Sequence, residues 1–288
     1  MDFGYTDHQR TLLAKVEDYC SRHCIPDAVA ESDLRPTFPK SSYVALAEGG
    51  ILGHWLPKGN GGGGGSFVDA LLICETLGKH NAALANLFIV NSVCGTLIAR
   101  NGSDEQKGMI LPAIARGECS MAFAMTEPNA GSDGSAIETQ AIADAQGYVL
   151  NGLKVYATGA LDADNLLLVA RTAGSGASKG GVGLFIVPRG STGLRVSAFD
   201  KVAGQSQASC EVVLENVRLL PGSLVGDERN TWGALGYAMS MERLGISGVL
   251  LGIASASVAE FAEFASQRVQ FGRTIIQFQA IQHQIAEL

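Results

Sequence analysis

The hydrophobic periodicity of this chain changes twice, and no other feature constrains its fold as strongly. Up to residue 117 the apolar residues recur at helical spacing, and β-rich runs separated by Gly, Asn and Asp then follow as far as residue 220. From Thr231 the helical period returns. This order predicts an α+β multidomain fold: an N-terminal helical domain (1–118), a central antiparallel β-sheet or small β-barrel (119–228), and the start of a C-terminal helical bundle (229–288).

The N-terminal third contains several helix signals. A helix is expected from Thr6 to about Cys24, a short one over 39–48, one from Ser66, a nearly all-apolar buried one over 81–100, and one that begins with a Ser103/Gln106 capping box and ends near Arg116. Between them lies PKGNGGGGGS (57–66). Consecutive glycines lose much backbone freedom on ordering, so this run is predicted to be a mobile loop.

The later elements follow from the same reasoning. Four β-rich runs lie at 148–158, 165–172, 183–189 and 210–220, and the Asn151-Gly152 pair predicts a tight hairpin. A helix with glycine interruptions is expected from Thr231 to about Gln270, where Phe271-Gly272 breaks it. The final FQAIQHQIAEL starts another helix without a stop signal, so we expect the sequence to be cut within an element.

Composition and charge exclude several classes of protein. The 288 residues carry a net charge of -7 and no basic run, which argues against a nucleic-acid surface. The N-terminus lacks a secretory signal, so a cytoplasmic protein is expected. The apolar run at 244–259 is too short and polar for a membrane span. Cys20, His23 and Cys24 lack a second ligand pair, so we predict no metal site and reduced, mostly buried thiols.

The stretch MTEPNAGSDGSA (125–136) has the composition of a ligand-binding loop. Gly131 and its small neighbours allow close approach to the backbone. Thr126, Ser132 and free backbone N–H groups could bind phosphate or ring heteroatoms. Pattern alone leaves a second interpretation open, a helix-to-strand turn chosen only for its backbone shape.

Four motifs together resemble the acyl-CoA dehydrogenase family of flavoproteins: MAFAMTEPNAGSDGSA, LNGLKVYATGA, MERLG and QRVQFGRTIIQFQAIQ. They occur in the family's order and spacing, and the resemblance covers the whole chain. It implies helical, β-barrel and helical domains, FAD as cofactor, an electron-transfer flavoprotein as electron acceptor, and a homodimer or homotetramer.

The resemblance also implies which residues bind FAD. Tyr156 replaces the family's usual Trp and keeps an aromatic face against the flavin, although a smaller one. Thr158 would donate to flavin N5, which accepts the hydride. Arg268 and Gln279 would reach FAD across a subunit interface, where the planar guanidinium suits phosphate. The expected cofactor-binding residues are Phe123, Met125, Thr126, Gly131, Ser132, Tyr156, Thr158, Arg268 and Gln279.

Removal of the weakly acidic α-proton of a thioester requires a desolvated carboxylate. In a minority of the family, which resembles isovaleryl- and long-chain acyl-CoA dehydrogenases, an ERL motif in the first long C-terminal helix supplies it. Here the motif predicts Glu242 as the catalytic base, with Ser132, Ser240 and Arg243 as substrate contacts. The family more often has Asp at 239 or 240, which weakens the transfer of the CoA contacts. The alternative for Glu242 is an ion pair on the helix surface.

Three functions remain open at this stage. The first is FAD-dependent α,β-dehydrogenation of an acyl-CoA. The second keeps the fold but acts on an acyl carrier protein or runs as an enoyl-thioester reductase. The third is a non-catalytic or truncated partner subunit, since the resemblance implies further segments for adenine binding and for polarising the thioester carbonyl.

Overall fold

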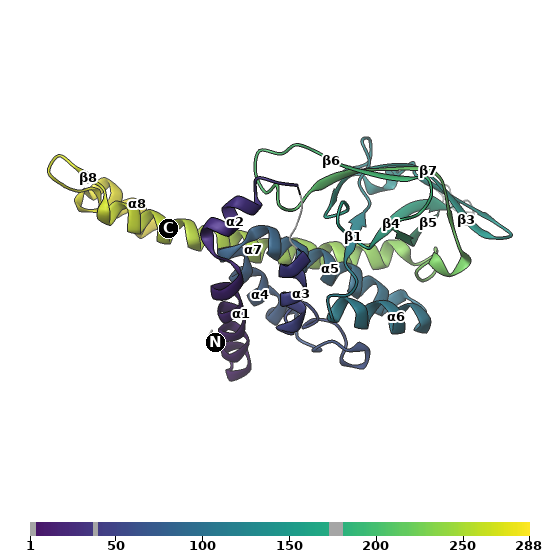
Figure 1. Ribbon diagram of the computed structural model, residues 1–288, viewed down its shortest axis with the longest axis horizontal. Coiled ribbons are helices and arrows are strands. Elements are labelled where there is room, and N and C mark those ends of the chain that lie inside the picture. The colour runs from purple at the N-terminus through teal and green to yellow at the C-terminus, as the bar shows by residue number, and fades with distance from the viewer. Residues whose placement is uncertain (1–3, 37–39, 173–180) are drawn as a thin grey trace.

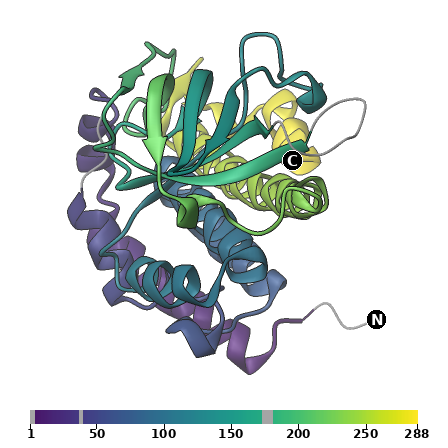
Figure 2. The ribbon, with the colours of Figure 1, turned by 90° about the vertical axis from the view of Figure 1, so that its right-hand side faces the viewer.

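A computed structural model describes residues 4–36, 40–172 and 181–288 of the chain. Helices α1 to α6 form one layer, a seven-stranded sheet forms another, and the long helix α7 runs between them (Figure 1). The view along α7 shows the sheet on one side of this helix and the N-terminal helices on the other (Figure 2). The three-part order is therefore confirmed, and the boundaries at 118/119 and 228/229 stay predictions.

The N-terminal layer has six helices in the described residues: α1 (Asp7–His23), α2 (Pro26–Ser32), α3 (Lys40–Glu48), α4 (Phe67–His80), α5 (Ala82–Asn101) and α6 (Asp104–Ala115). Capping boxes begin α1, α4 and α6. In each, the side chain of Thr6, Ser66 or Ser103 accepts from the backbone N–H of the third helical residue, and the side chain of that residue accepts from the backbone N–H of the Thr or Ser. α5 is almost wholly buried, as predicted. α2 was not predicted, and the predicted start of α3 at Pro39 lies outside the described residues.

The glycine run is ordered, which corrects the expectation of a mobile loop. After a 3₁₀ turn (η1, Lys58–Asn60), Gly63 N donates to Gly53 O at 2.9 Å and Gly65 N donates to His54 O at 2.8 Å. A Cβ at Gly62 would lie 2.2 Å from Leu56 O. The absence of side chains thus lets two backbone segments pair, and these hydrogen bonds offset the entropy of ordering.

The sheet comprises β1 (Met121–Ala124), β2 (Gln140–Asp144), β3 (Gly147–Thr158), β4 (Asn165–Thr172), β5 (Gly181–Pro188), β6 (Leu194–Ala198) and β7 (Ser209–Leu219). Its order is β1-β4-β2-β3-β7-β6, and β5 pairs with β4. The β1/β4 and β2/β4 pairs are parallel and the others antiparallel, so the sheet is mixed rather than purely antiparallel as predicted. It forms a half-barrel with a buried aliphatic core.

The predicted hairpin at Asn151-Gly152 is wrong. β3 runs straight through both residues, and its pairing with β7 shifts register between Leu150 and Gly152. Gly152 has a φ of 154°, and a Cβ there would lie 2.4 Å from Thr139 Oγ1. The Asn-Gly pair therefore marks a bulge where another backbone approaches closely, rather than a turn.

After the 3₁₀ turn η3 (Pro221–Ser223), α7 (Thr231–Gln267) continues for 37 residues without the predicted interruptions. Two of its glycines, Gly248 and Gly252, lie where it meets α4: a Cβ at Gly252 would be 2.1 Å from Glu75 O, and on the α4 side a Cβ at Gly78 would be 2.6 Å from Val249 O. Small residues therefore bring the two helices into backbone contact.

A terminal arm follows with β8 (Val269–Gln270), β9 (Arg273–Thr274), η4 (Ile275–Gln277) and α8 (Gln279–Glu287), and it projects away from the rest (Figure 1).

Within the part of the chain that the structure describes, two helices are long and apolar enough to cross a membrane by length and composition alone. In α5, 78% of the apolar window is buried, so α5 is a core helix; in α7 only 22% is buried. Residues 244–259 are predicted to be too short for a membrane span, but this prediction does not hold because the run lies inside the longer α7. Leu250 and Leu251 of α7 are 59% and 54% exposed, which leaves an apolar face on this helix.

Candidate active site

The predicted ligand loop at 125–136 is anchored by a buried ion pair. The Glu127 carboxylate accepts from Lys154 Nζ at 2.6 Å, from Glu138 N at 2.6 Å and from Thr139 N at 3.0 Å, and the Lys154 amine also donates to Met125 O at 3.0 Å. Both side chains are almost fully buried. Glu127 thus ties the start of the loop to the middle of β3 through Lys154, and to the segment that follows the loop through Glu138 and Thr139.

The surroundings of this pair shift the pKa values of both side chains. Burial opposes ionisation of Glu127, but its hydrogen bonds, first from Lys154, hold the pKa of the carboxyl below its ordinary value. Burial lowers the pKa of Lys154 to about 8, despite the attraction of Glu127. Sequence reasoning missed this pair. The only signal was a lysine on the same face of a predicted strand as the buried Leu150.

The end of β3 lies directly beside the start of this loop. Val155 N donates to Thr126 O at 2.9 Å, so the backbone of Thr126 lies against the part of β3 that also carries Tyr156 and Thr158. Tyr156 has a φ of 58° at a register shift between Lys154 and Ala157, and its side chain is 68% exposed. A bulky residue held in the left-handed region is strained, and such strain concentrates at ligand sites.

The first turn of α7 closes the other side of the loop. A Cβ at Gly134 would lie 2.7 Å from Met125 Cε and 3.6 Å from the Trp232 ring. Met125 and Phe123 are both partly buried and pack against the helical core. The residues predicted from the first motif thus lie at the seam between the sheet and α7, with Gly131 and Ser132 exposed in the connecting turn.

Glu242 of α7 is partly buried rather than exposed on the helix surface. Desolvation raises the pKa of its carboxyl above the ordinary value, and the neighbouring Arg243 charge opposes this rise. Burial, and after it the charge of Glu242, raises the pKa of the Cys94 thiol, which places Glu242 near α5. No Glu242 ion pair occurs among the described residues, while Ser240 and Arg243 are exposed.

The residues at this seam fit a flavin. Among the described residues, neither Thr126 nor Thr158 uses its hydroxyl in a hydrogen bond, and the exposed Tyr156 offers an aromatic face. A Cβ at Gly131 would meet nothing within 4 Å, so the turn is open to a ligand. Free hydroxyls, an aromatic plane and an open turn form a donor set suited to a planar heterocycle with a phosphate tail.

Arg268 and Gln279 are not brought to this seam within one chain. Both are exposed on the terminal arm, where Arg268 N donates to Phe264 O at 2.9 Å and Arg268 O accepts from Ile275 N at 2.8 Å. Figure 1 shows the arm extending away from the sheet. Their predicted contact with FAD therefore requires another copy of the chain.

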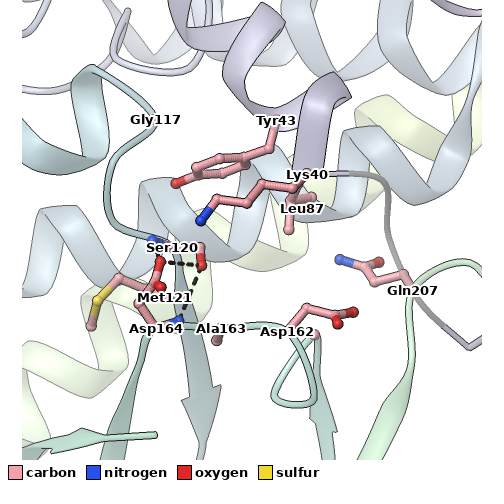
Figure 3. Close-up of a pocket in the computed structure, with 11 residues that line it drawn as sticks. Lys40, Tyr43, Leu87, Gly117, Ser120, Met121, Asp162, Ala163, Asp164 and Gln207 are labelled. Carbon is pink, nitrogen blue, oxygen red and sulfur yellow. Dashed lines mark hydrogen bonds between the residues drawn. The ribbon is translucent and has the colours of Figure 1, made fainter.

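Two cavities adjoin the predicted residues. One of about 150 Å³ lies between α3, α5 and the sheet, where Lys40, Tyr43 and Asp162 line it and the amide nitrogen of buried Gln207 has no partner (Figure 3). It contains no predicted site residue, although Gly159 follows Thr158. The other, of about 10 Å³, lies between α4, α5 and α7, and Met241 beside Glu242 forms part of its apolar wall.

Comparison with known proteins assigns the family. The N-terminal, middle and C-terminal domains of acyl-CoA dehydrogenase match residues 6–118, 122–217 and 232–288. The chain therefore belongs to the acyl-CoA dehydrogenase family of flavoprotein oxidoreductases, which is FAD-dependent. The match over 232–288 also assigns α7 and the terminal arm to the C-terminal helical domain.

Individual relatives agree with this assignment. The chain is 33% identical to a 3-(aryl)acrylate reductase of Clostridium sporogenes and 28% identical to caffeyl-CoA reductase-Etf complex subunit CarC of Acetobacterium woodii, covering 99% of this chain and 75% and 76% of those proteins. The butyryl-CoA dehydrogenase structure from Megasphaera elsdenii superposes with a TM-score of 0.92 at 30% identity, over 100% of this chain and 76% of that one. The chain thus spans about three quarters of these relatives.

Proposed function

We propose that this protein is an FAD-dependent acyl-CoA dehydrogenase in which Glu242 removes the α-proton of the thioester. The observation that carries the proposal is a carboxylate without an ion pair among the described residues, desolvated on α7, the helix whose first turn closes the loop at 125–136. A raised proton affinity is what a base acting on a weak carbon acid needs. Bound FAD supplies the two-electron acceptor of the reaction.

The other residues would bind and orient. Thr126 and Thr158 would donate their free hydroxyls to the flavin ring, and Tyr156 would cover one face of it. Phe123 and Met125 would line the ring, and Gly131 and Ser132 would meet the pyrophosphate. These roles rest on the family resemblance and on the position of the residues at one seam.

The substrate side of the site extends along α7. Arg243 and Ser240, both exposed, would contact the CoA portion together with Ser132. The acyl group would enter between α4, α5 and α7, where the cavity beside Met241 is now only about 10 Å³. Because this volume holds about one water, long acyl groups require side chains to move, which favours short ones.

Assembly and electron transfer follow from the same proposal. Arg268 and Gln279 on the projecting arm would contact FAD held by a second copy of the chain, as a homodimer or homotetramer. An electron-transfer flavoprotein would take the electrons from reduced FAD.

The decisive experiment follows the flavin spectrum during anaerobic addition of acyl-CoA thioesters of increasing length. Wild-type protein should be yellow and bleach, whereas Glu242→Gln should retain FAD and fail to bleach. Glu260→Gln, which changes an exposed carboxylate of the same helix, is the matched control and should bleach normally. Bleaching of Glu242→Gln at the wild-type rate would exclude Glu242 as the base.

A second candidate is the reverse reaction, because two of the three similar proteins described above, those of Clostridium sporogenes and Acetobacterium woodii, are named reductases. In that case enoyl-CoA should reoxidise the flavin of pre-reduced protein at a higher rate than acyl-CoA reduces the flavin of the oxidised protein. The same assay with acyl carrier protein in place of CoA separates the two carriers. Colourless protein that cannot be reconstituted with FAD would instead support a non-catalytic partner subunit.

A further inference from the structure

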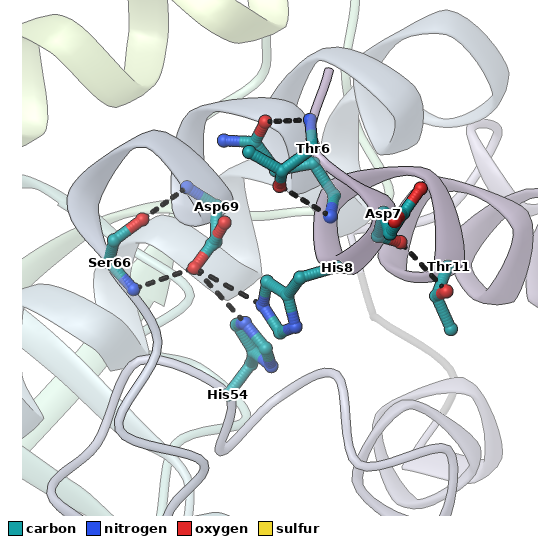
Figure 4. A network of polar contacts seen from close by, with 8 residues as sticks. Thr6, Asp7, His8, Thr11, His54, Ser66 and Asp69 are labelled. Atoms are coloured by element: carbon teal, nitrogen blue, oxygen red, sulfur yellow. Dashed lines mark hydrogen bonds and ion pairs between the residues drawn. The ribbon is translucent and has the colours of Figure 1, made fainter.

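A cluster of three metal-ligating side chains lies outside the seam, where α1, α4 and the glycine run meet. His8 comes from the first turn of α1, Asp69 from the first turn of α4, and His54 from the segment before the glycines (Figure 4). Their ligand atoms all lie within 4.8 Å of one another. The three residues are far apart in the sequence, so no spacing rule could reveal them.

The distances in this cluster suit a shared ion better than direct hydrogen bonds. His8 Nε2 lies 3.6 Å and His54 Nε2 lies 3.8 Å from the same oxygen, Asp69 Oδ2. Both separations exceed the range of an N–H···O hydrogen bond. Bonds of about 2.0–2.1 Å in a tetrahedral site put ligand atoms about 3.4 Å apart, so each His–Asp pair is within half an ångström of that spacing.

His54 and Asp69 are both held in place by their surroundings, and His54 keeps a ring nitrogen that is free to bind a ligand. His54 Nε2 is buried without any hydrogen-bond partner, which is costly for a polar atom. A Cβ at Gly65 would lie 2.4 Å from this nitrogen, so only a glycine leaves room beside it. Asp69 is buried and is held by Ser66, whose N–H donates to Oδ2 at 2.7 Å.

We propose that His8, His54 and Asp69 bind a divalent transition-metal ion such as Zn²⁺, with water completing its coordination. Two imidazoles and a carboxylate are ligands that Zn²⁺ and Co²⁺ accept readily. The side chain of His8 is 65% exposed, so it can swing inward to close the remaining gap to His54. The bound ion joins the start of α1 to α4 and the glycine run, and its exposed side leaves space for water.

The test uses untagged full-length protein that has been stripped with a chelator and dialysed. Titration with Co²⁺, followed by visible absorption and by calorimetry with Zn²⁺, should show about one equivalent bound. Zn²⁺ should also raise the thermal midpoint. His8→Ala should bind at least about 10-fold more weakly and lose the thermal shift, because it removes a direct ligand.

The control is His23→Ala, which removes another exposed histidine of the same helix and should bind as the wild type does. His8 is exposed, so its loss should leave the metal-free thermal midpoint unchanged and a folding defect is excluded directly. The proposal is overturned by wild-type protein that binds less than one equivalent, or by His8→Ala that binds as tightly as wild type.

Discussion

The buried pair of Glu127 and Lys154 gives the sharpest test of how the site is held. In Lys154→Met the amine that donates to Glu127 at 2.6 Å and to Met125 O at 3.0 Å is replaced by an apolar chain of similar length. Removal of one partner of a buried pair costs about 3–5 kcal/mol. Glu127 keeps two backbone donors, from Glu138 and Thr139, so we expect the lower end, about 3 kcal/mol.

Urea unfolding of Lys154→Met, followed by two spectroscopic probes, should measure this loss. Hydrogen exchange adds a local readout, because the Glu138 and Thr139 amides donate to Glu127 and should exchange faster. The double variant Glu127→Gln/Lys154→Met should lose about 2 kcal/mol less than the sum of the single variants, since the two sites are coupled. A Lys154→Met protein with unchanged stability and unchanged exchange at both amides would refute the anchoring role.

Three further predictions concern α7 and the terminal arm. Gly252→Ala should cost about 1–3 kcal/mol in urea unfolding, because its Cβ meets Glu75 O at 2.1 Å; Gly236→Ala in the same helix meets nothing within 4 Å and should be neutral or stabilising. Equal stabilities would contradict the close approach of α4 and α7. Arg268→Ala should weaken FAD retention on gel filtration, and unchanged affinity would remove the assigned contact. The rate of flavin bleaching should rise with pH as Glu242 ionises, with a midpoint above 4.5, because burial raises its pKa; a lower midpoint would exclude this base.

Much of the fold could be predicted because its signals are local. The Ser103/Gln106 capping box, the apolar run of α5 and the β-rich segments depend on residues close together in sequence, and the structure confirms them. The errors occur where distant backbone decides the outcome. Gly152 has the sequence signature of a turn, but its conformation is set by Thr139, which lies against it. The glycine run has the composition of a mobile loop, but its N–H groups bind the backbone of residues 53–56.

The candidate site likewise contains residues that local motifs indicate and residues whose role depends on distant parts of the chain. Thr126, Tyr156 and Thr158 could be proposed from their motifs, and the Val155 N to Thr126 O hydrogen bond places the backbone of Thr126 against the strand that carries the other two, while their contact with FAD stays a prediction. The Glu127–Lys154 pair could not, since a charged residue in an otherwise apolar strand does not reveal its partner 27 positions away. The exposed position of Arg268 is also beyond sequence reasoning, because it depends on how far the arm extends.

The backbone contact between α4 and α7 determines which parts can move as one body. Glu242 is carried by a helix locked to the N-terminal layer through Gly78 and Gly252, whereas Thr126 and Thr158 belong to the sheet. The sheet is tied to the same helical layer, because Met121 N of β1 donates to Asn91 Oδ1 of α5 at 2.8 Å inside the core. If the proposed function holds, the distance between the base and the flavin would therefore be set by this packing of backbone on backbone, and not by flexible side chains.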